Sequence, residues 1–244
     1  MEWLYLSPHF DDVPFSCGGL VWEQAQTAKR VSVWTICAGD PPPGPLTPFA
    51  EKLHARWDLK QSAVRQRRNE DIESCRMLGV VVQHFNIPDC IYRRSAEDGS
   101  PYYPGEIDIF GEMHPEEAGL VDELAAMLDQ ALPLQVNLVS PLTIGNHVDH
   151  QLVRAAAERL DRPLWYYADV PYDMEDIESD NEKCAGMLPV LMSVSEEGLD
   201  AWERSVTAYA SQISSFWSNP QAAREAIREY HRQFNGIRLW RKGN

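Results

Sequence analysis

The alternation of apolar runs with helix-like segments constrains the fold most strongly. Five short apolar runs are bounded by turn residues, as buried strands are. They cover residues 2–7, 30–36, 80–86, 134–140 and 163–170. Helical patterns follow the first four runs or lie between them, at about 16–29, 59–79, 115–131 and 148–160. Strands that alternate with helices predict an α/β fold, with a mostly parallel sheet and helices on both faces.

The length of the chain fits one such core. Two more helical patterns and a short last strand follow, at 197–217, 219–234 and 236–241. At 244 residues a single α/β core is able to bury about 70–75% of the unfolded surface. We therefore expect one domain over residues 1–244, with right-handed connections between its parallel strands.

Two long segments interrupt the alternation. Residues 38–57 are rich in proline, and neither they nor residues 87–114 have a helix or strand pattern. Loops of this length in a compact domain are usually functional or disordered. Each follows a predicted strand, so both belong at the carboxyl edge of the sheet, where open α/β sheets bind ligands. The sequence therefore predicts the active site at this edge.

Charge and cysteine content exclude several classes of protein. The formal net charge is −15, whereas nucleic acids and anionic membranes need a basic footprint. No apolar run approaches the roughly 20 residues of a membrane span, and the first predicted strand leaves no room for a signal peptide. Five cysteines without a CxxC pair indicate free thiols in a reducing compartment. We expect a cytoplasmic protein that acts on a small molecule.

The stretch HFDD, at residues 9–12, places an imidazole and two carboxylates where the first predicted strand ends. Neighbouring side chains in near-extended chain point in opposite directions, so Asp11 and Asp12 should not both bind one ion. His9 and Asp12 offer the nitrogen and oxygen donors that zinc accepts. The alternative is structural, because Asp12 also suits the N-cap of the next helix, with Pro14 in its first turn.

The stretch GNHVDH, at residues 145–150, repeats this arrangement after the fourth predicted strand. His147 and His150 are three residues apart, so they share one face of a helix. A structural interpretation makes Asn146 an N-cap and Asp149 a partner of the helix's positive end. It accounts for neither histidine. We predict that the two stretches meet at one metal ion.

Three ligands from the two stretches would leave a position open for water, as catalytic zinc sites require. The predicted ligands are His9, Asp12 and His150. Such an ion lowers the pKa of its water to about 7.

The remaining side chains of the stretches suit catalytic roles. We predict that Asp11 takes the proton of the water and that His147 stabilises an oxyanion or a leaving group. Asp149 is predicted to orient His147 and to favour its charged form. This set describes metal-assisted hydrolysis of an amide or ester.

At these residues the chain resembles the PIG-L/LmbE-like N-deacetylases, zinc-dependent enzymes with a Rossmann-like fold. Their first motif is commonly a small residue or proline and then His-Pro-Asp-Asp-Glu, and residues 8–13 read PHFDDV. Their second motif is His-x-Asp-His, and residues 147–150 read HVDH. Members remove acetyl groups from N-acetylglucosamine conjugates. The resemblance implies this activity, with the ligands and catalytic residues named above.

The resemblance also implies residues that bind the sugar. The segment RQRRNEDIESCRMLGV resembles the family's helix of arginine and glutamate, and FNIPDCIYR resembles a segment whose aspartate holds sugar hydroxyls. Arg68 is the implied sugar contact, with Asp89 opposite. Arg65 and Arg67 lie close to Arg68 in register. A solvated, salt-bridged helix face is the alternative interpretation.

The chain departs from the family pattern at three positions. Phe10 replaces the usual proline and Val13 the usual glutamate, and neither is a predicted ligand. Some members have a tyrosine where this chain has Gly145. Three tyrosines of the second long loop are candidates for its role: Tyr92, Tyr102 and Tyr103.

Two other functions fit parts of the pattern. A non-catalytic metal-binding or sugar-binding module on the same fold would need neither Asp11 nor His147, and both are present. A nucleotide-binding Rossmann domain would carry GxGxxG after its first strand, which this chain lacks. Zinc is the expected cofactor, with iron and cobalt as alternatives. The expected partner is an N-acetyl amino-sugar conjugate, and the family also includes homo-oligomers.

Overall fold

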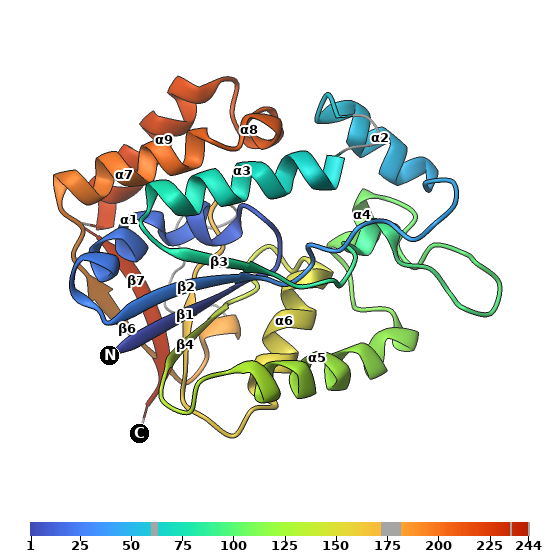
Figure 1. The fold of residues 1–244 in the computed structure, drawn as a ribbon, viewed down its shortest axis with the longest axis horizontal. Coiled ribbons are helices and arrows are strands. Elements are labelled where there is room, and N and C mark those ends of the chain that lie inside the picture. The colour runs from blue at the N-terminus through green and yellow to red at the C-terminus, as the bar shows by residue number, and fades with distance from the viewer. Residues whose placement is uncertain (60–62, 172–181, 235, 244) are drawn as a thin grey trace.

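The computed structural model describes residues 1–59, 63–171, 182–234 and 236–243. Within them, one seven-stranded sheet has the order β3-β2-β1-β4-β5-β7-β6 (Figure 1). Its strands are β1 (Glu2–Ser7), β2 (Arg30–Thr35), β3 (Val81–His84), β4 (Asn137–Pro141), β5 (Leu164–Tyr167), β6 (Met187–Met192) and β7 (Ile237–Lys242). The first five run parallel, whereas β7 is antiparallel to both β5 and β6. The predicted mostly parallel sheet is confirmed.

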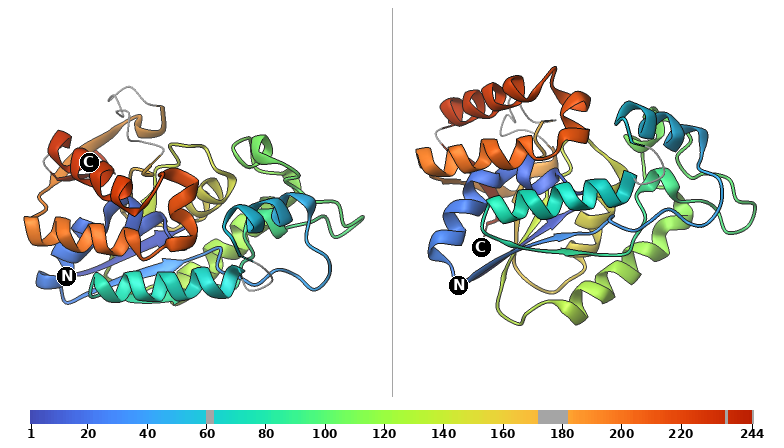
Figure 2. Two further views of the ribbon diagram at one scale, coloured as in Figure 1. Left: turned by 90° about the horizontal axis from the view of Figure 1, so that it is seen from above. Right: turned by 45° about the horizontal axis from the view of Figure 1, so that its top comes forward.

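Helices cover both faces of the sheet (Figures 1 and 2). They are α1 (Asp12–Thr27), α2 (Pro48–Arg56), α3 (Ala63–Met77), α4 (Glu106–Ile109), α5 (Ala118–Ala131), α6 (Val148–Glu158), α7 (Glu196–Thr207), α8 (Ala210–Phe216) and α9 (Pro220–Phe234). Helices α1, α3, α7 and α9 lie on one face, and α5 and α6 on the other. Among the described residues, no helix combines the length and apolar character needed to cross a membrane.

Strand β1 illustrates why the apolar runs are nearly continuous. Its side chains alternate between the two faces because a strand has a period of two. Tyr5 packs into the core beneath α1 and α7, while Leu4 and Leu6 pack into the core beneath α5 and α6. A parallel sheet with both faces covered therefore needs apolar residues at successive positions.

Some predicted elements differ from the observed ones. The loop 38–57 contains α2, which Thr47 caps by accepting a hydrogen bond from the Ala50 N–H, with Pro48 as first residue. Strand β6 was not predicted because Pro189 interrupts it; proline is tolerated at the sheet edge, where β6 lies. The pattern at 197–217 forms two helices, α7 and α8. Of the helix predicted at 59–79, residues 60–62 lie outside the described residues.

Candidate metal centre

The two histidine and aspartate stretches meet where β1 and β4 end. These strands are neighbours in the sheet and run parallel, so the chain leaves both at the same edge. Asp12 is the first residue of α1 rather than its N-cap, and Asp11 at the N-cap makes no capping hydrogen bond through its side chain. The capping interpretation of the first stretch is therefore wrong, and both carboxylates are available to the cleft.

Asp12 lies between two imidazole rings. Its Oδ2 is 3.4 Å from His9 Nδ1, and its Oδ1 is 3.3 Å from His150 Nε2. Burial favours the neutral acid, but the His150 and His9 rings hold the pKa of Asp12 well below its usual range. The three predicted ligands therefore converge. His147 adds a second possible donor set, because nitrogens of His9, His147 and His150 lie within 4.8 Å of one another.

In each predicted histidine ligand, the ring nitrogen that points away from Asp12, here called the outer nitrogen, faces a second carboxylate. His9 Nε2 is 2.9 Å from Asp149 Oδ2, and His150 Nδ1 is 2.5 Å from Asp169 Oδ1. Such partners fix the ring orientation and direct the inner nitrogen toward Asp12, where a metal would bind, as in carboxylate–histidine–zinc sites. The residues present therefore fit a zinc ion. Asp169, which follows β5, was missed; the rule that polar residues at strand ends form the site would have found it.

Asp11 is buried beside Asp12 but faces a different neighbour. Its Oδ1 is 3.6 Å from Arg67 Nη2. Burial raises the pKa of Asp11 to about 6, against the effect of the Arg67 charge. Their surroundings thus shift the pKa values of the two adjacent aspartates in opposite directions, which suits different roles for the two carboxylates.

His147 caps α6 with its own side chain. Its Nδ1 accepts a hydrogen bond of 3.2 Å from the Asp149 N–H, which places the proton of the neutral ring on Nε2. Burial, together with the neighbouring His9, lowers the pKa of His147 well below its usual value. The Asp149 carboxylate bonds His9 and Arg93 instead of the His147 ring. The predicted role of Asp149 in orienting and charging His147 stays a prediction: its charge raises the pKa of His147 but does not outweigh burial and the neighbouring His9. The N-cap of α6 is His147, so the N-cap role of Asn146 is wrong.

The α3 arginine that lines the cleft is Arg67 rather than the predicted Arg68. Arg67 is buried, and its Nη1 is 3.7 Å from Asp89 Oδ2. Arg68, one residue on, turns away and donates to the Ala38 carbonyl at 2.8 Å. A helix rotates by about 100° per residue, so adjacent arginines cannot share a face. Asp89 lines the cleft as predicted.

The cleft around these residues encloses about 320 Å³. Both long loops contribute to it, through α2 and α4, and α8 closes another side. Its apolar lining includes Phe49, Leu53, Trp57, Ile109, Phe110 and Phe216. The three candidate tyrosines do not line it; they bond other residues, Tyr92 with His54 and Tyr103 with Glu117. The loop 38–57 was expected at this edge, but its helix α2 and the contribution of α8 to the cleft were not predicted.

The comparison with protein families decides the classification. The family described as GlcNAc-PI de-N-acetylase, PIG-L, matches residues 4–160, more than half of the chain. The chain belongs to the PIG-L family. The match includes most of β1, all of β4 and both histidine and aspartate stretches of this PIG-L chain.

Individual relatives of this PIG-L chain are deacetylases. A 2'-N-acetylparomamine deacetylase of Niallia circulans is 32% identical, over 69% of this chain and 66% of the relative, about two thirds of its length. A protein of the same name from Streptomyces fradiae is 26% identical, over 98% of this chain and 81% of the relative. The zinc-inhibited form of teicoplanin deacetylase Orf2 has a TM-score of 0.80 and 26% identity, over 99% and 97% of the two chains.

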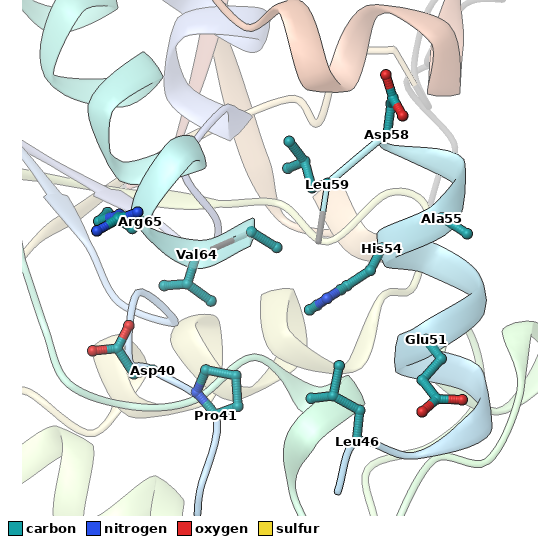
Figure 3. Close-up of a pocket in the computed structure, with 11 residues that line it drawn as sticks. Asp40, Pro41, Leu46, Glu51, His54, Ala55, Asp58, Leu59, Val64 and Arg65 are labelled. Atoms are coloured by element: carbon teal, nitrogen blue, oxygen red, sulfur yellow. The ribbon is translucent and has the colours of Figure 1, made fainter. Parts of the chain in front are cut away.

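The PIG-L chain also has a larger cavity, of about 1060 Å³, beside α2 and the start of α3 (Figure 3). Leu46, His54, Leu59 and Val64 surround it, and Arg65 lies at its side (Figure 3). None of the predicted ligands or catalytic residues lines it. Size alone therefore does not identify the reactive cleft, which is recognised by its convergent polar groups.

Proposed function

We propose that the chain is a zinc-dependent deacetylase that hydrolyses the N-acetyl group of an amino-sugar conjugate. One observation carries the proposal: Asp12 lies between His9 Nδ1 and His150 Nε2, while both outer nitrogens face carboxylates. This is the arrangement of a metal site with oriented ligands. The deacetylase relatives support the reaction type.

Asp11 is the proposed general base. When bound, a zinc ion supplies a Lewis acid that polarises the acetyl carbonyl and lowers the pKa of a water molecule. Asp11 takes the proton of the attacking water, because it is adjacent to the ligand Asp12 and is not itself a ligand. As the amide C–N bond breaks, the same proton passes to the leaving nitrogen, which departs as an amine.

His147 is the proposed stabiliser of the oxyanion. Its Nδ1 is already occupied by the Asp149 N–H, so the neutral ring offers the Nε2–H as its only donor. That donor acts on the acetyl oxygen as negative charge develops. A neutral histidine is sufficient for this role, which agrees with its lowered pKa.

Arg67 and Asp89 are proposed to bind sugar hydroxyls. They offer donors and acceptors in the cleft, 3.7 Å apart, between the metal ligands and the apolar wall. Trp57 and Phe110 offer flat apolar surfaces that suit a sugar ring. We further propose that residues 1–244 act as one domain in the cytoplasm, which agrees with five buried cysteines that form no disulfide within the part of the chain that the structure describes.

A panel of N-acetylated amino sugars, their conjugates and glycopeptides tests the proposal. The zinc-loaded protein should release free amine from at least one of them, and removal of the metal by a chelator should stop the reaction. Activity on peptides alone would contradict the substrate class. Binding of zinc and of a sugar without any release of amine would instead favour a non-catalytic binding module.

A further inference from the structure

The carboxylate of Asp149 is fully buried and is held from two sides. Its Oδ2 is 2.9 Å from His9 Nε2 and also accepts a hydrogen bond of 3.0 Å from the Cys90 N–H. Its Oδ1 accepts from Arg93 Nη1 at 2.5 Å. Arg93 lies in the second long loop, 56 residues before Asp149 in the chain. The position of the partner of His9 therefore depends on an arginine outside both motifs.

Arg93 is itself held by a second carboxylate. Its Nε and Nη2 donate to the two oxygens of Glu117 at 2.5 and 3.1 Å. Glu117 ends the short helical turn Pro115–Glu117 before α5, and it also accepts a hydrogen bond from the Tyr103 hydroxyl. Arg93 and Glu117 are 7% and 3% exposed. The guanidinium thus bridges two buried carboxylates with separate edges of its planar fork.

We propose that Arg93 is a positioning residue of the metal site. Glu117 fixes the guanidinium, the guanidinium fixes the Asp149 carboxylate, and that carboxylate fixes the direction in which His9 Nδ1 faces Asp12. Arg93 also neutralises the charge of Asp149 in a site that excludes water. This inference rests on the metal site of the proposed function, but it concerns residues that neither motif contains.

The neighbouring Arg94 provides a matched control. It follows Arg93 directly, yet it is more exposed and donates to the carbonyls of Gly99 and Pro45 at 3.2 and 2.9 Å. A lysine at position 93 keeps the charge but offers one compact ammonium in place of the fork, so it cannot hold both carboxylates as arginine does. A lysine at position 94 replaces only surface contacts.

The experiment measures zinc affinity of Arg93→Lys, Glu117→Gln and Arg94→Lys by competition with a chromophoric chelator. Loss of a residue that orients a metal ligand without binding the metal typically weakens metal binding by about 10- to 100-fold, and we expect this weakening for Arg93→Lys. The zinc affinity of Glu117→Gln should fall by a smaller factor, and the zinc affinity of Arg94→Lys should equal that of the parent. The visible spectrum of the cobalt-substituted protein should shift in Arg93→Lys alone or most strongly, because it reports ligand geometry.

Thermal unfolding of the metal-free variants separates positioning from simple stability. A variant that unfolds earlier but keeps the parental zinc affinity and cobalt spectrum has lost only a structural contact, and this result for Arg93→Lys overturns the proposal. If Arg93→Lys does not fold, Glu117→Gln decides by the same two readouts. A parent that binds zinc tightly but deacetylates nothing contradicts the proposed function and leaves the role of Arg93 standing. A parent that binds no zinc contradicts both.

Discussion

The inner wall and the outer rim of the cleft are built differently. The inner wall consists of largely buried polar residues that follow β1, β4 and β5, and two of its histidines, His9 and His150, face carboxylates on both sides. The outer rim comes from α2 and α4, inside the two long loops, and it is mainly apolar. The rim also carries the exposed ion pair of Arg56 and Glu106, with 3.3 Å between Arg56 Nη1 and Glu106 Oε1.

The difference indicates which part sets the reaction and which part sets the substrate. Strand pairing fixes the ends of β1 and β4 relative to each other, and the buried hydrogen bonds of the wall leave little freedom to its side chains. Loops on a rigid scaffold tolerate change more readily and often carry specificity. We therefore expect substitutions in the wall to abolish chemistry and substitutions in the rim to alter which conjugate binds.

Asp12→Ala tests the wall most severely. It removes the carboxylate that lies between His9 and His150, so zinc affinity should fall by more than the 10- to 100-fold that is typical when a residue orienting a metal ligand is lost. Activity should disappear with the metal. Zinc content after dialysis and turnover on the best substrate of the panel measure both effects. Asp122→Ala, on the exposed face of α5, is the control and should retain both.

Asp11→Asn separates the base from the ligands within the same wall. The variant keeps the shape and the three proposed ligands but loses the group that accepts a proton. General-base catalysis is typically worth about 10²–10⁴-fold in rate, so turnover should fall by this factor while zinc content stays near the parental value. The acidic limb of the pH–rate profile should also disappear. Full activity would exclude Asp11 as the base. Loss of zinc in Asp11→Asn, together with its retention in Asp12→Ala, would show that the roles of the two aspartates are exchanged.

Arg67→Gln probes the boundary between wall and rim. A hydrogen bond to a charged group is worth about 1.5–3 kcal/mol, so loss of one sugar contact should raise KM or lower kcat/KM by about 10- to 100-fold. Arg68→Gln is the matched control, since Arg68 bonds the Ala38 carbonyl outside the cleft lining. Equal kinetics in the two variants would show that Arg67 does not contact the substrate. Zinc content should remain unchanged in both.

The fold and the inner wall were predictable because they depend on short-range patterns. Apolar runs and turn residues locate the parallel strands, and polar residues directly after β1 and β4 must share one edge. The choice of Arg67 over Arg68 was not predictable. One residue along a helix turns the side chain by about 100°, and the sequence pattern does not fix where α3 begins. Arg93 and Glu117 were missed because their pairing joins a loop to the start of a predicted helix, 24 residues apart in the chain, and follows no local periodicity.

The rim was less predictable for a related reason. Helix α2 is nine residues long and lies among prolines, so its pattern is too short to stand out from the loop. The pattern at 197–217 predicted one continuous helix where the structure has α7 and α8. The residues Gln212 and Ser215, which line the cleft, belong to α8. Strand β6 contains a proline that argues against a central strand and is acceptable only at the edge.

The ion pair of Arg56 and Glu106 gives the smallest expected effect and tests the rim directly. The side chains are 38% and 52% exposed, so the pair should contribute at most about 0.2–1 kcal/mol to the free energy of unfolding. A double-mutant cycle of Arg56→Gln and Glu106→Gln measures this coupling by denaturant unfolding. The hydrogen bond from Arg56 lowers the pKa of Glu106 in the folded state. The coupling should therefore be present above the unfolded pKa of about 4.3 and be lost as the pH falls through the lower folded pKa.

Turnover of these variants should change little, whereas relative KM values across the substrate panel should change, because the ion pair of Arg56 and Glu106 joins the two loops beside the cleft. A coupling well above 1 kcal/mol, or a loss of turnover as large as that of Asp11→Asn, would show that rim and wall are not separate in function.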